Sequence, residues 1–128
     1  MSRKKILIVE DETVQLTMVA KRLKTAGYDV IGARDGISAI SIARKEQPDL
    51  ILLDLGLPGG DGFVVMQRLQ TLVSTMTIPI VVASSLDPAH NEEASKRAGA
   101  IAFLHKPVDF ERLLKVIAES IGTPELSP

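Results

Sequence analysis

The sequence predicts an α/β protein with a doubly wound, five-stranded parallel sheet. Short apolar runs alternate along the chain with longer segments of helical periodicity, and five such pairs can be counted. This alternation is typical of βα units whose parallel strands are buried on both faces. The chain has 128 residues, of which 45% are hydrophobic, and this is the size and composition of one compact domain with a single core.

Each expected strand is a short run in which apolar residues predominate. The runs cover residues 5–9, 29–33, 50–54, 79–84 and 101–104. The run at 29–33 alternates apolar and polar residues more than the others do, which favours a place at an edge of the sheet.

The expected helices cover residues 12–26, 37–47, 62–74, 88–98 and 110–121. Gly27 and Gly99 are expected to end the first and the fourth helix, and Asp109 to cap the fifth. The first, third and fifth helices each carry an apolar stripe at helical spacing: Leu16, Val19 and Leu23; Phe63, Met66, Leu69 and Val73; Phe110, Leu113, Leu114, Ile117 and Ile121. The fourth has little apolar surface besides Ala94 and Ala98, so we expect it to be the loosest helix.

The domain is expected to span residues 1–122. Residues 123–128 follow the last apolar stripe and include two prolines, so we expect a disordered tail or the start of a linker there. The sequence shows no internal repeat and no low-complexity segment.

Composition and charge exclude several classes of function. The chain has 15 basic and 16 acidic residues and a net charge of -1, so no overall field attracts nucleic acid or anionic lipid, and neither is expected as a direct partner. No apolar stretch approaches the ~20 residues that span a bilayer. The start of the chain lacks the apolar core of a signal peptide, so we expect a cytoplasmic protein.

The available metal ligands are also restricted. Because the chain has no cysteine, it can form neither a disulfide, nor a thiolate nucleophile, nor a zinc site with cysteine ligands. Its two histidines, His90 and His105, are too few and too scattered to build a metal cage. Any metal must therefore be a hard cation bound by oxygen.

Polar side chains gather where the expected strands end. Glu10 and Asp11 follow the first strand, Asp54 ends the third, Ser84 ends the fourth and Lys106 follows the fifth. Ligands of open α/β sheets bind outside the carboxyl ends of the strands. Carboxylates gathered there raise one another's pKa unless a cation lies among them. Carboxylates, a hydroxyl and an ammonium together indicate a site for a phosphoryl group and its metal.

Magnesium is the metal that this set of residues favours, because it prefers oxygen ligands and retains several waters. Asp11 and Asp54 are the expected direct ligands, with Glu10 reaching the ion through water. A backbone carbonyl is expected from the glycine-rich loop at residues 55–62, which can fold back over the metal, and Gly56 is our choice.

The landmarks of the chain, taken together, resemble the receiver domain of two-component response regulators. They extend from Lys4 to about Gly122: Glu10-Asp11, Gly27-Tyr28, Asp35-Gly36, Pro48-Asp49, Asp54, Leu57-Pro58, Asp61-Gly62, Ile78-Pro79, Ala98-Gly99-Ala100 and Lys106-Pro107. With this resemblance we expect the flavodoxin-like strand order 2-1-3-4-5.

The resemblance also implies how such a domain works. Asp54 would accept a phosphoryl group from a phosphohistidine on a sensor histidine kinase or a histidine phosphotransfer domain, with Mg²⁺ held by Glu10 and Asp11. Ser84 and Lys106 would bind the phosphoryl oxygens, and Phe103 would rotate inward when Ser84 moves. Lys106-Pro107 should be a cis peptide.

The implied output is a change of surface rather than turnover of a separate substrate. The domain would catalyse only its own phosphorylation and dephosphorylation. The phosphoryl charge would reshape the surface formed by the fourth helix, the fifth strand and the fifth helix. A downstream protein or an attached output domain would read that surface.

Two other functions stay open at this point. Each site residue taken singly favours a structural interpretation. A pseudo-receiver that acts only as an interaction module would normally have lost part of the acidic pocket, whereas this chain keeps every member of it. A phosphatase with Asp54 as its nucleophile would need a second acid two residues later, where Gly56 stands.

The sequence departs from common family usage at several positions. Ile101-Ala102 stand where winged-helix regulators usually carry an acidic pair for dimer salt bridges, so we expect a monomer before phosphorylation and leave the activated dimer open. Ser85 replaces a usual alanine. Gly56 and Leu86 flank the expected phosphoryl site with side chains that cannot orient a water, which predicts slow loss of the phosphoryl group.

Overall fold

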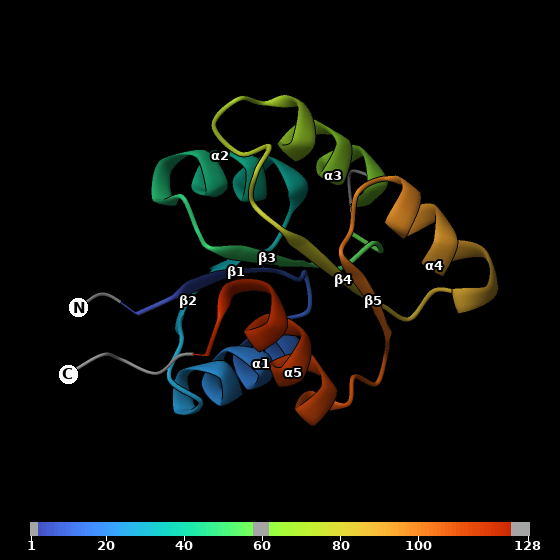
Figure 1. Cartoon of the computed structure of the whole chain (residues 1–128). Helices are drawn as coiled ribbons and strands as arrows, with labels where there is room; N and C mark the ends of the chain where they lie inside the picture. The colour runs from blue at the N-terminus through green and yellow to red at the C-terminus, as the bar shows by residue number, and fades with distance from the viewer. Residues whose placement is uncertain (1–2, 58–61, 124–128) are drawn as a thin grey trace.

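A computed structural model describes residues 3–57 and 62–123 of the chain (Figure 1). Residues 58–61 of the expected glycine-rich loop and residues 124–128 of the expected tail lie outside the described residues, as do residues 1–2 of the expected domain. None of the helices in the described part is long and apolar enough to cross a membrane.

Five parallel strands form one sheet, as the sequence predicts. They are β1 (Lys5–Val9), β2 (Asp29–Ala33), β3 (Leu50–Leu53), β4 (Ile80–Ser84) and β5 (Ala102–His105). The order across the sheet is β2-β1-β3-β4-β5, which confirms both the expected topology and the edge position of the second strand. Because β1 and β3 are paired, Val9 lies opposite Leu53, and the residues that follow them emerge side by side.

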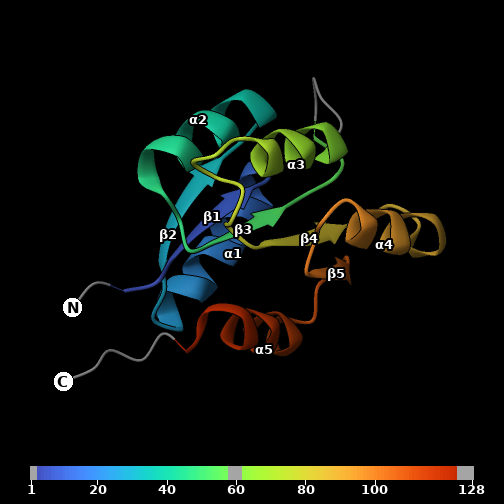
Figure 2. The ribbon, with the colours of Figure 1, turned by 45° about the horizontal axis from the view of Figure 1, so that its top comes forward.

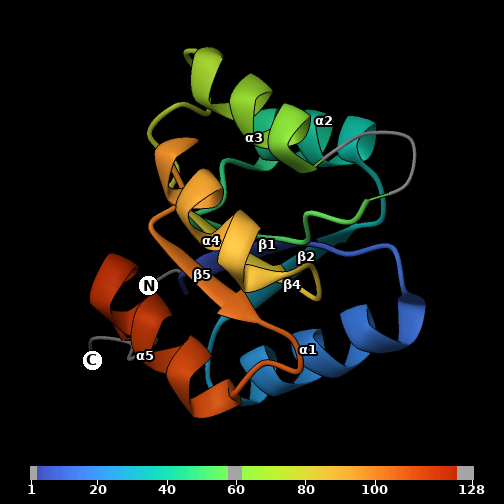
Figure 3. The same cartoon turned by 90° about the vertical axis from the view of Figure 1, so that its right-hand side faces the viewer.

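Five helices cover the two faces of the sheet. They are α1 (Thr13–Thr25), α2 (Gly36–Glu46), α3 (Gly62–Thr71), α4 (Pro88–Arg97) and α5 (Phe110–Ile121). Helices α1 and α5 lie on one face, and α2 and α3 lie on the other (Figures 1 and 2). Figure 3 looks toward the β5 edge, where α4 and α5 lie on opposite sides of the strand.

The central strands are buried on both faces, because each face supplies its own apolar core. Alternate residues of β3 point to opposite sides: Leu50 and Leu52 pack with α1 and α5, whereas Ile51 and Leu53 pack with α2 and α3. This two-sided burial explains the nearly continuous apolar runs in the sequence.

The local signals at helix ends are confirmed. Asp109 accepts hydrogen bonds from the backbone N–H groups of Glu111 and Arg112, and so caps α5. Gly27 and Gly99 follow α1 and α4 with φ of 107° and 111°, a conformation that glycine adopts without steric cost.

The predicted end of the third helix is wrong. Helix α3 ends at Thr71, and Val73, which we expected on its apolar stripe, is 88% exposed. Thr75 is buried instead, and its hydroxyl donates to the carbonyl oxygen of Leu69 at 2.5 Å. The chain leaves the helix early because a turn held by this polar contact leads into β4, which helical periodicity alone does not reveal.

The fifth strand begins one residue later than expected. Ile101 precedes β5 and is 48% exposed, while His105 ends the strand. The backbone N–H of Lys106 donates to the carbonyl of Ser84 at 2.8 Å. This contact continues the pairing with β4 and brings Lys106 to the carboxyl edge of the sheet.

Candidate functional site

Three carboxylates meet at the carboxyl ends of β1 and β3. Glu10, Asp11 and Asp54 each offer one oxygen, and these oxygens lie within 4.8 Å of one another. The backbone holds them in place, because the N–H of Asp54 donates to the carbonyl of Val9 at 3.1 Å and that of Glu10 donates to Ala33 at 2.9 Å. Glu10 is buried with 6% exposure, and the other two are half-buried.

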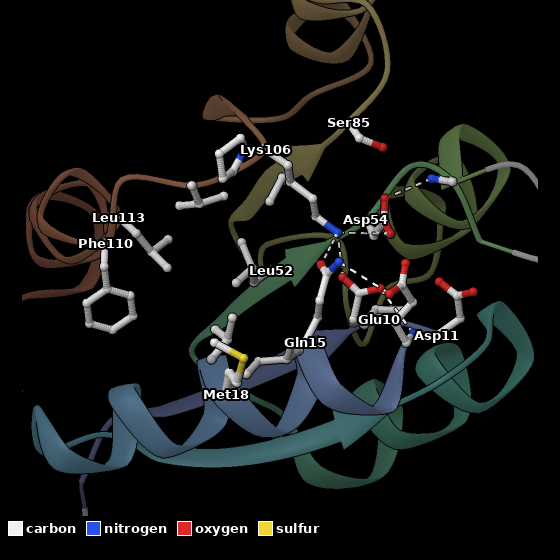
Figure 4. A pocket seen from close by; sticks show the side chains of 18 of the residues that line it. Glu10, Asp11, Gln15, Met18, Leu52, Asp54, Ser85, Lys106, Phe110 and Leu113 are labelled. Carbon is white, nitrogen blue, oxygen red and sulfur yellow. Dashed lines mark hydrogen bonds and ion pairs between the residues drawn. The ribbon is translucent and has the colours of Figure 1, made fainter.

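Lys106 joins this cluster from the end of β5. Its Nζ lies 2.5 Å from Glu10 Oε1 and 3.3 Å from Asp54 Oδ2. It also donates to the side-chain oxygen of Gln15 on α1 at 2.9 Å, and Figure 4 shows the three acceptors around the ammonium. A lysine ammonium has three N–H groups, so all of them have partners here.

The cluster shifts the pKa values of its members. Burial raises the pKa of Glu10, although the hydrogen bond from Lys106 opposes this change. Burial by itself would lower the pKa of Lys106, but its hydrogen bond to Glu10 and the charge of Asp54 outweigh that effect, so the pKa is raised. Lys106 is therefore held as a cation beside the carboxylates.

Asp54 is positioned by two close backbone contacts. Its Oδ1 accepts a hydrogen bond from the N–H of Gly56 at 2.9 Å. Behind it, a Cβ at Gly62 would come within 2.5 Å of Leu55 Cα and 2.9 Å of the Asp54 carbonyl. Gly62 therefore lets the start of α3 approach the backbone of the site residue. The carbonyl of Gly56 as a metal ligand stays a prediction.

The two expected switch residues are both buried. Ser84 is fully buried, and its Oγ accepts a hydrogen bond from the N–H of Leu86 at 3.0 Å. Phe103 is 4% exposed and packs with the core on the α2 and α3 side, so in this conformation it already points inward. The rotation of Phe103 and the movement of Ser84 stay predictions.

A cavity of about 610 Å³ extends from the carboxylates into the space between α1 and α5. One end of the cavity is lined by polar residues, which include Glu10, Asp11, Gln15, Asp54, Ser85 and Lys106. The end toward α5, at the left of Figure 4, is lined by apolar residues that include Met18, Leu52, Phe110 and Leu113. Ser85 rather than Ser84 lines this cavity among the described residues.

Sequence reasoning missed two residues near the site. Gln15 carries no motif that marks it in the sequence. It lies four residues after Asp11 in the first turns of α1, where a side chain can turn back toward the strand ends. Arg34, after β2, donates from Nε and Nη2 to the carbonyl of Asp11 at 3.4 and 3.2 Å. The expected cis peptide at Lys106-Pro107 is confirmed.

The fold and the position of this cluster define a doubly wound α/β protein whose polar residues gather outside the carboxyl ends of the strands, where ligands of such folds bind. Residues 6–118 match the family model described as the response regulator receiver domain. The chain therefore belongs to the response regulator receiver family.

Relatives of different overall length share this domain. Protein PilH of Pseudomonas aeruginosa is 35% identical over 113 residues, which cover 88% of this chain and 93% of PilH. The DNA-binding dual master transcriptional regulator RpaA of Synechocystis is 41% identical over 110 residues, which cover 86% of this chain but only 46% of RpaA.

A solved structure shares the fold along almost the whole chain. It is the receiver domain of the sensor histidine kinase PA1611 from Pseudomonas aeruginosa, described with a magnesium ion coordinated in the active site cleft. It has a TM-score of 0.86 and 28% sequence identity, and the match covers 96% of this chain and 100% of that one.

Proposed function

We propose that this chain is a phospho-accepting receiver of a two-component phosphorelay, with Asp54 as the acceptor. The observation that carries the proposal is the convergence of Lys106 on Glu10 and Asp54, with Asp11 in the same carboxylate cluster. A fixed cation beside a half-buried carboxylate favours a reaction in which negative charge grows on transferred phosphoryl oxygens. Its cytoplasmic location stays a prediction.

The proposed reaction transfers a phosphoryl group from nitrogen directly to Asp54. An oxygen of Asp54 forms a bond to phosphorus while the P–N bond of a phosphohistidine breaks, and the bonding electron pair stays on the imidazole nitrogen, which takes up a proton. The phosphohistidine belongs to a sensor histidine kinase or a histidine phosphotransfer domain. The N–H of Gly56 orients Asp54, and Lys106 faces the incoming charge.

The carboxylate cluster fits a hard divalent cation, because its donors are oxygens of Glu10, Asp11 and Asp54 and include no sulfur or imidazole. We propose Mg²⁺, held by these residues with the carbonyl of Gly56 as a further ligand. When bound, the ion supplies positive charge that offsets the charge of the phosphoryl oxygens. Loss of any one carboxylate is expected to weaken its binding.

The proposed output begins at Ser84. Its hydroxyl now accepts the N–H of Leu86, at the turn that leads into α4. A phosphoryl oxygen on Asp54 would accept the O–H of Ser84, and movement of the hydroxyl toward it would change the bond from Leu86 and with it the β4–α4 turn. We propose that the surface of α4, β5 and α5 changes as a result, together with the buried Phe103. A downstream protein or an attached output domain would read the change.

No observation on this chain favours either alternative function, the pseudo-receiver or the phosphatase. A pseudo-receiver would not need a cluster of Glu10, Asp11 and Asp54 in which Lys106 contacts two of the three carboxylates. A phosphatase would need an acid two residues after Asp54, where Gly56 stands. We therefore propose no catalysis beyond phosphorylation and dephosphorylation of Asp54 itself.

The test is phosphorylation of the purified chain by acetyl phosphate with Mg²⁺, followed by intact-mass measurement. Wild type should gain one phosphoryl group, which is lost in mild base as expected for an acyl phosphate. Asp54→Asn should gain none. Asp29→Asn is the matched control, because Asp29 is an exposed carboxylate at the opposite edge of the sheet. Equal labelling of Asp54→Asn and wild type would refute the proposal.

A further inference from the structure

Gln15 makes a contact that the reaction proposed above does not require. Its Oε1 accepts a hydrogen bond from Lys106 at 2.9 Å, while its Nε2 donates to Glu12 Oε2 at 3.4 Å. The two contacts fix the orientation of the amide. If the amide were rotated by half a turn, its NH₂ group would face the ammonium and its oxygen would face the carboxylate, so both contacts would become repulsive.

Gln15 differs from the other two partners of Lys106 in charge. Glu10 and Asp54 are carboxylates, and both are committed to the proposed cation and phosphoryl group. The Gln15 amide is neutral and comes from α1, on the wall of the cavity (Figure 4). It can keep its bond to Lys106 while the partners of the two carboxylates change, without cancelling the positive charge of the ammonium.

We infer that Gln15 is a positioning residue for Lys106. Together with Glu10 it holds two of the three N–H groups, which leaves the third for Asp54 and, after transfer, for a phosphoryl oxygen. The contact to Asp54 is the longest of the three, at 3.3 Å, so this N–H is the one most easily given to a new acceptor. This inference rests on the proposed function of Asp54.

Gln15→Met tests the inference, because methionine has nearly the same length and no comparable acceptor. The rate of phosphorylation by acetyl phosphate at saturating Mg²⁺ should fall about tenfold to a hundredfold, the effect of losing one hydrogen bond to a charged group. Gln70→Met is the matched control. Gln70 is also a helical glutamine with one long-range contact, donated to the Gly99 carbonyl on the other face of the sheet, and its loss should leave the rate unchanged.

A double-variant comparison separates positioning from a general structural effect. In a Lys106→Met background, Gln15→Met should not lower the phosphorylation rate further, because Gln15 acts on the reaction only through Lys106. A further loss of similar size in that background would overturn the inference. The inference would also be overturned if Gln15→Met were phosphorylated as fast as wild type. Failure of wild type to accept phosphate would refute the proposed function instead.

A second measurement does not depend on turnover. The side-chain ¹⁵N resonance of Lys106 should be visible through slowly exchanging protons in wild type, and Gln15→Met should accelerate that exchange. Gln15→Glu restores an oxygen acceptor of the same reach and should slow the exchange again. Titration of each variant with Mg²⁺, followed by backbone NMR, should give the wild-type affinity for Gln15→Met. If Gln15→Met lowered the Mg²⁺ affinity by the same factor as the phosphorylation rate, the substitution would act through the carboxylates that hold the ion, and the inference would be overturned.

Discussion

At the scale of single residues, burial disfavours the charged forms of Glu10 and Lys106, whereas their contact with each other favours them. Glu10 is buried and would favour its neutral form, but Lys106 lies 2.5 Å away and favours the carboxylate. Burial likewise disfavours the ammonium, and Glu10 and Asp54 outweigh that effect. Each group is thus stabilised in its charged form by the other, so removal of one partner leaves a buried or half-buried charge unpaired.

The lifetime of the phosphoryl group should depend on two neighbouring side chains. Hydrolysis needs a water held in line behind phosphorus, and neither Gly56 nor Leu86 can orient one. A Cβ at Gly56 would lie 3.6 Å from Asp54 Oδ1, an ordinary contact, so Gly56→Asn can be accommodated and would bring an amide to the site. We expect the double variant Gly56→Asn, Leu86→Glu to lose its phosphoryl group faster than wild type.

Decay of phosphorylated protein after removal of the donor measures this lifetime. Each single variant should show part of the acceleration. Gln70→Met again serves as the control that leaves the site unchanged. If the double variant decays no faster than wild type, these two residues do not set the lifetime.

At the scale of elements, α4 is the helix with the least apolar anchorage. Among its residues Ser95 is the one that is buried, whereas α5 buries Leu113 and Ile117. The pairs Lys96–Glu92 and Arg97–Glu93 join residues one turn apart on the exposed face of α4. Such exposed pairs contribute only about 0.3–0.5 kcal/mol each, less than burial of one large apolar side chain.

Hydrogen exchange should therefore be faster over α4 than over α1 and α5. Because α4 follows the turn held by Ser84 and Leu86, beryllofluoride with Mg²⁺ should change its exchange more than that of α1. Mass spectrometry of peptides that cover each helix, with Asp54→Asn as the control that cannot respond, measures both effects. Equal protection of the three helices, unaffected by beryllofluoride, would contradict this prediction.

At the scale of the whole molecule, the β5 side presents the surface where association is expected. Ile101 stands beside β5 with 48% exposure, and the acidic pair that winged-helix regulators use for dimer salt bridges is missing there. An activated dimer would thus rely on apolar contact. One exposed isoleucine is a small patch, which favours a monomer in the unphosphorylated state.

Light scattering at micromolar concentration tests this expectation. Wild type should be monomeric without phosphoryl analogue, and any dimer formed with beryllofluoride should be lost in Ile101→Asp. Ile37→Asp is the control, because Ile37 is 85% exposed on α2, at the other side of the molecule. A dimer before activation, or an activated dimer that Ile101→Asp does not affect, would rule out this mode of association.

The alternation of strands and helices and the residues at the strand ends could be predicted from the sequence. A parallel strand buried on both faces must be apolar over nearly its full length, so Leu50–Leu53 and Ile80–Ser84 stand out without any knowledge of their neighbours. The polar residue that ends such a run is equally visible, and parallel pairing brings these ends to one edge. Glu10, Asp54 and Lys106 could therefore be predicted together.

The side chains that meet across elements could not be predicted from the sequence. The exposure of Val73 and the burial of Thr75 depend on where the chain turns toward β4, and a helical stripe continues past that point in the sequence. Gln15 resembles any polar residue on a solvated helix until the fold brings the start of α1 and the end of β5 to the same end of the sheet. Its amide then reaches Lys106, 91 positions away in the chain. Local sequence encodes the periodicity of burial, whereas a contact between distant residues depends on the packing of whole elements.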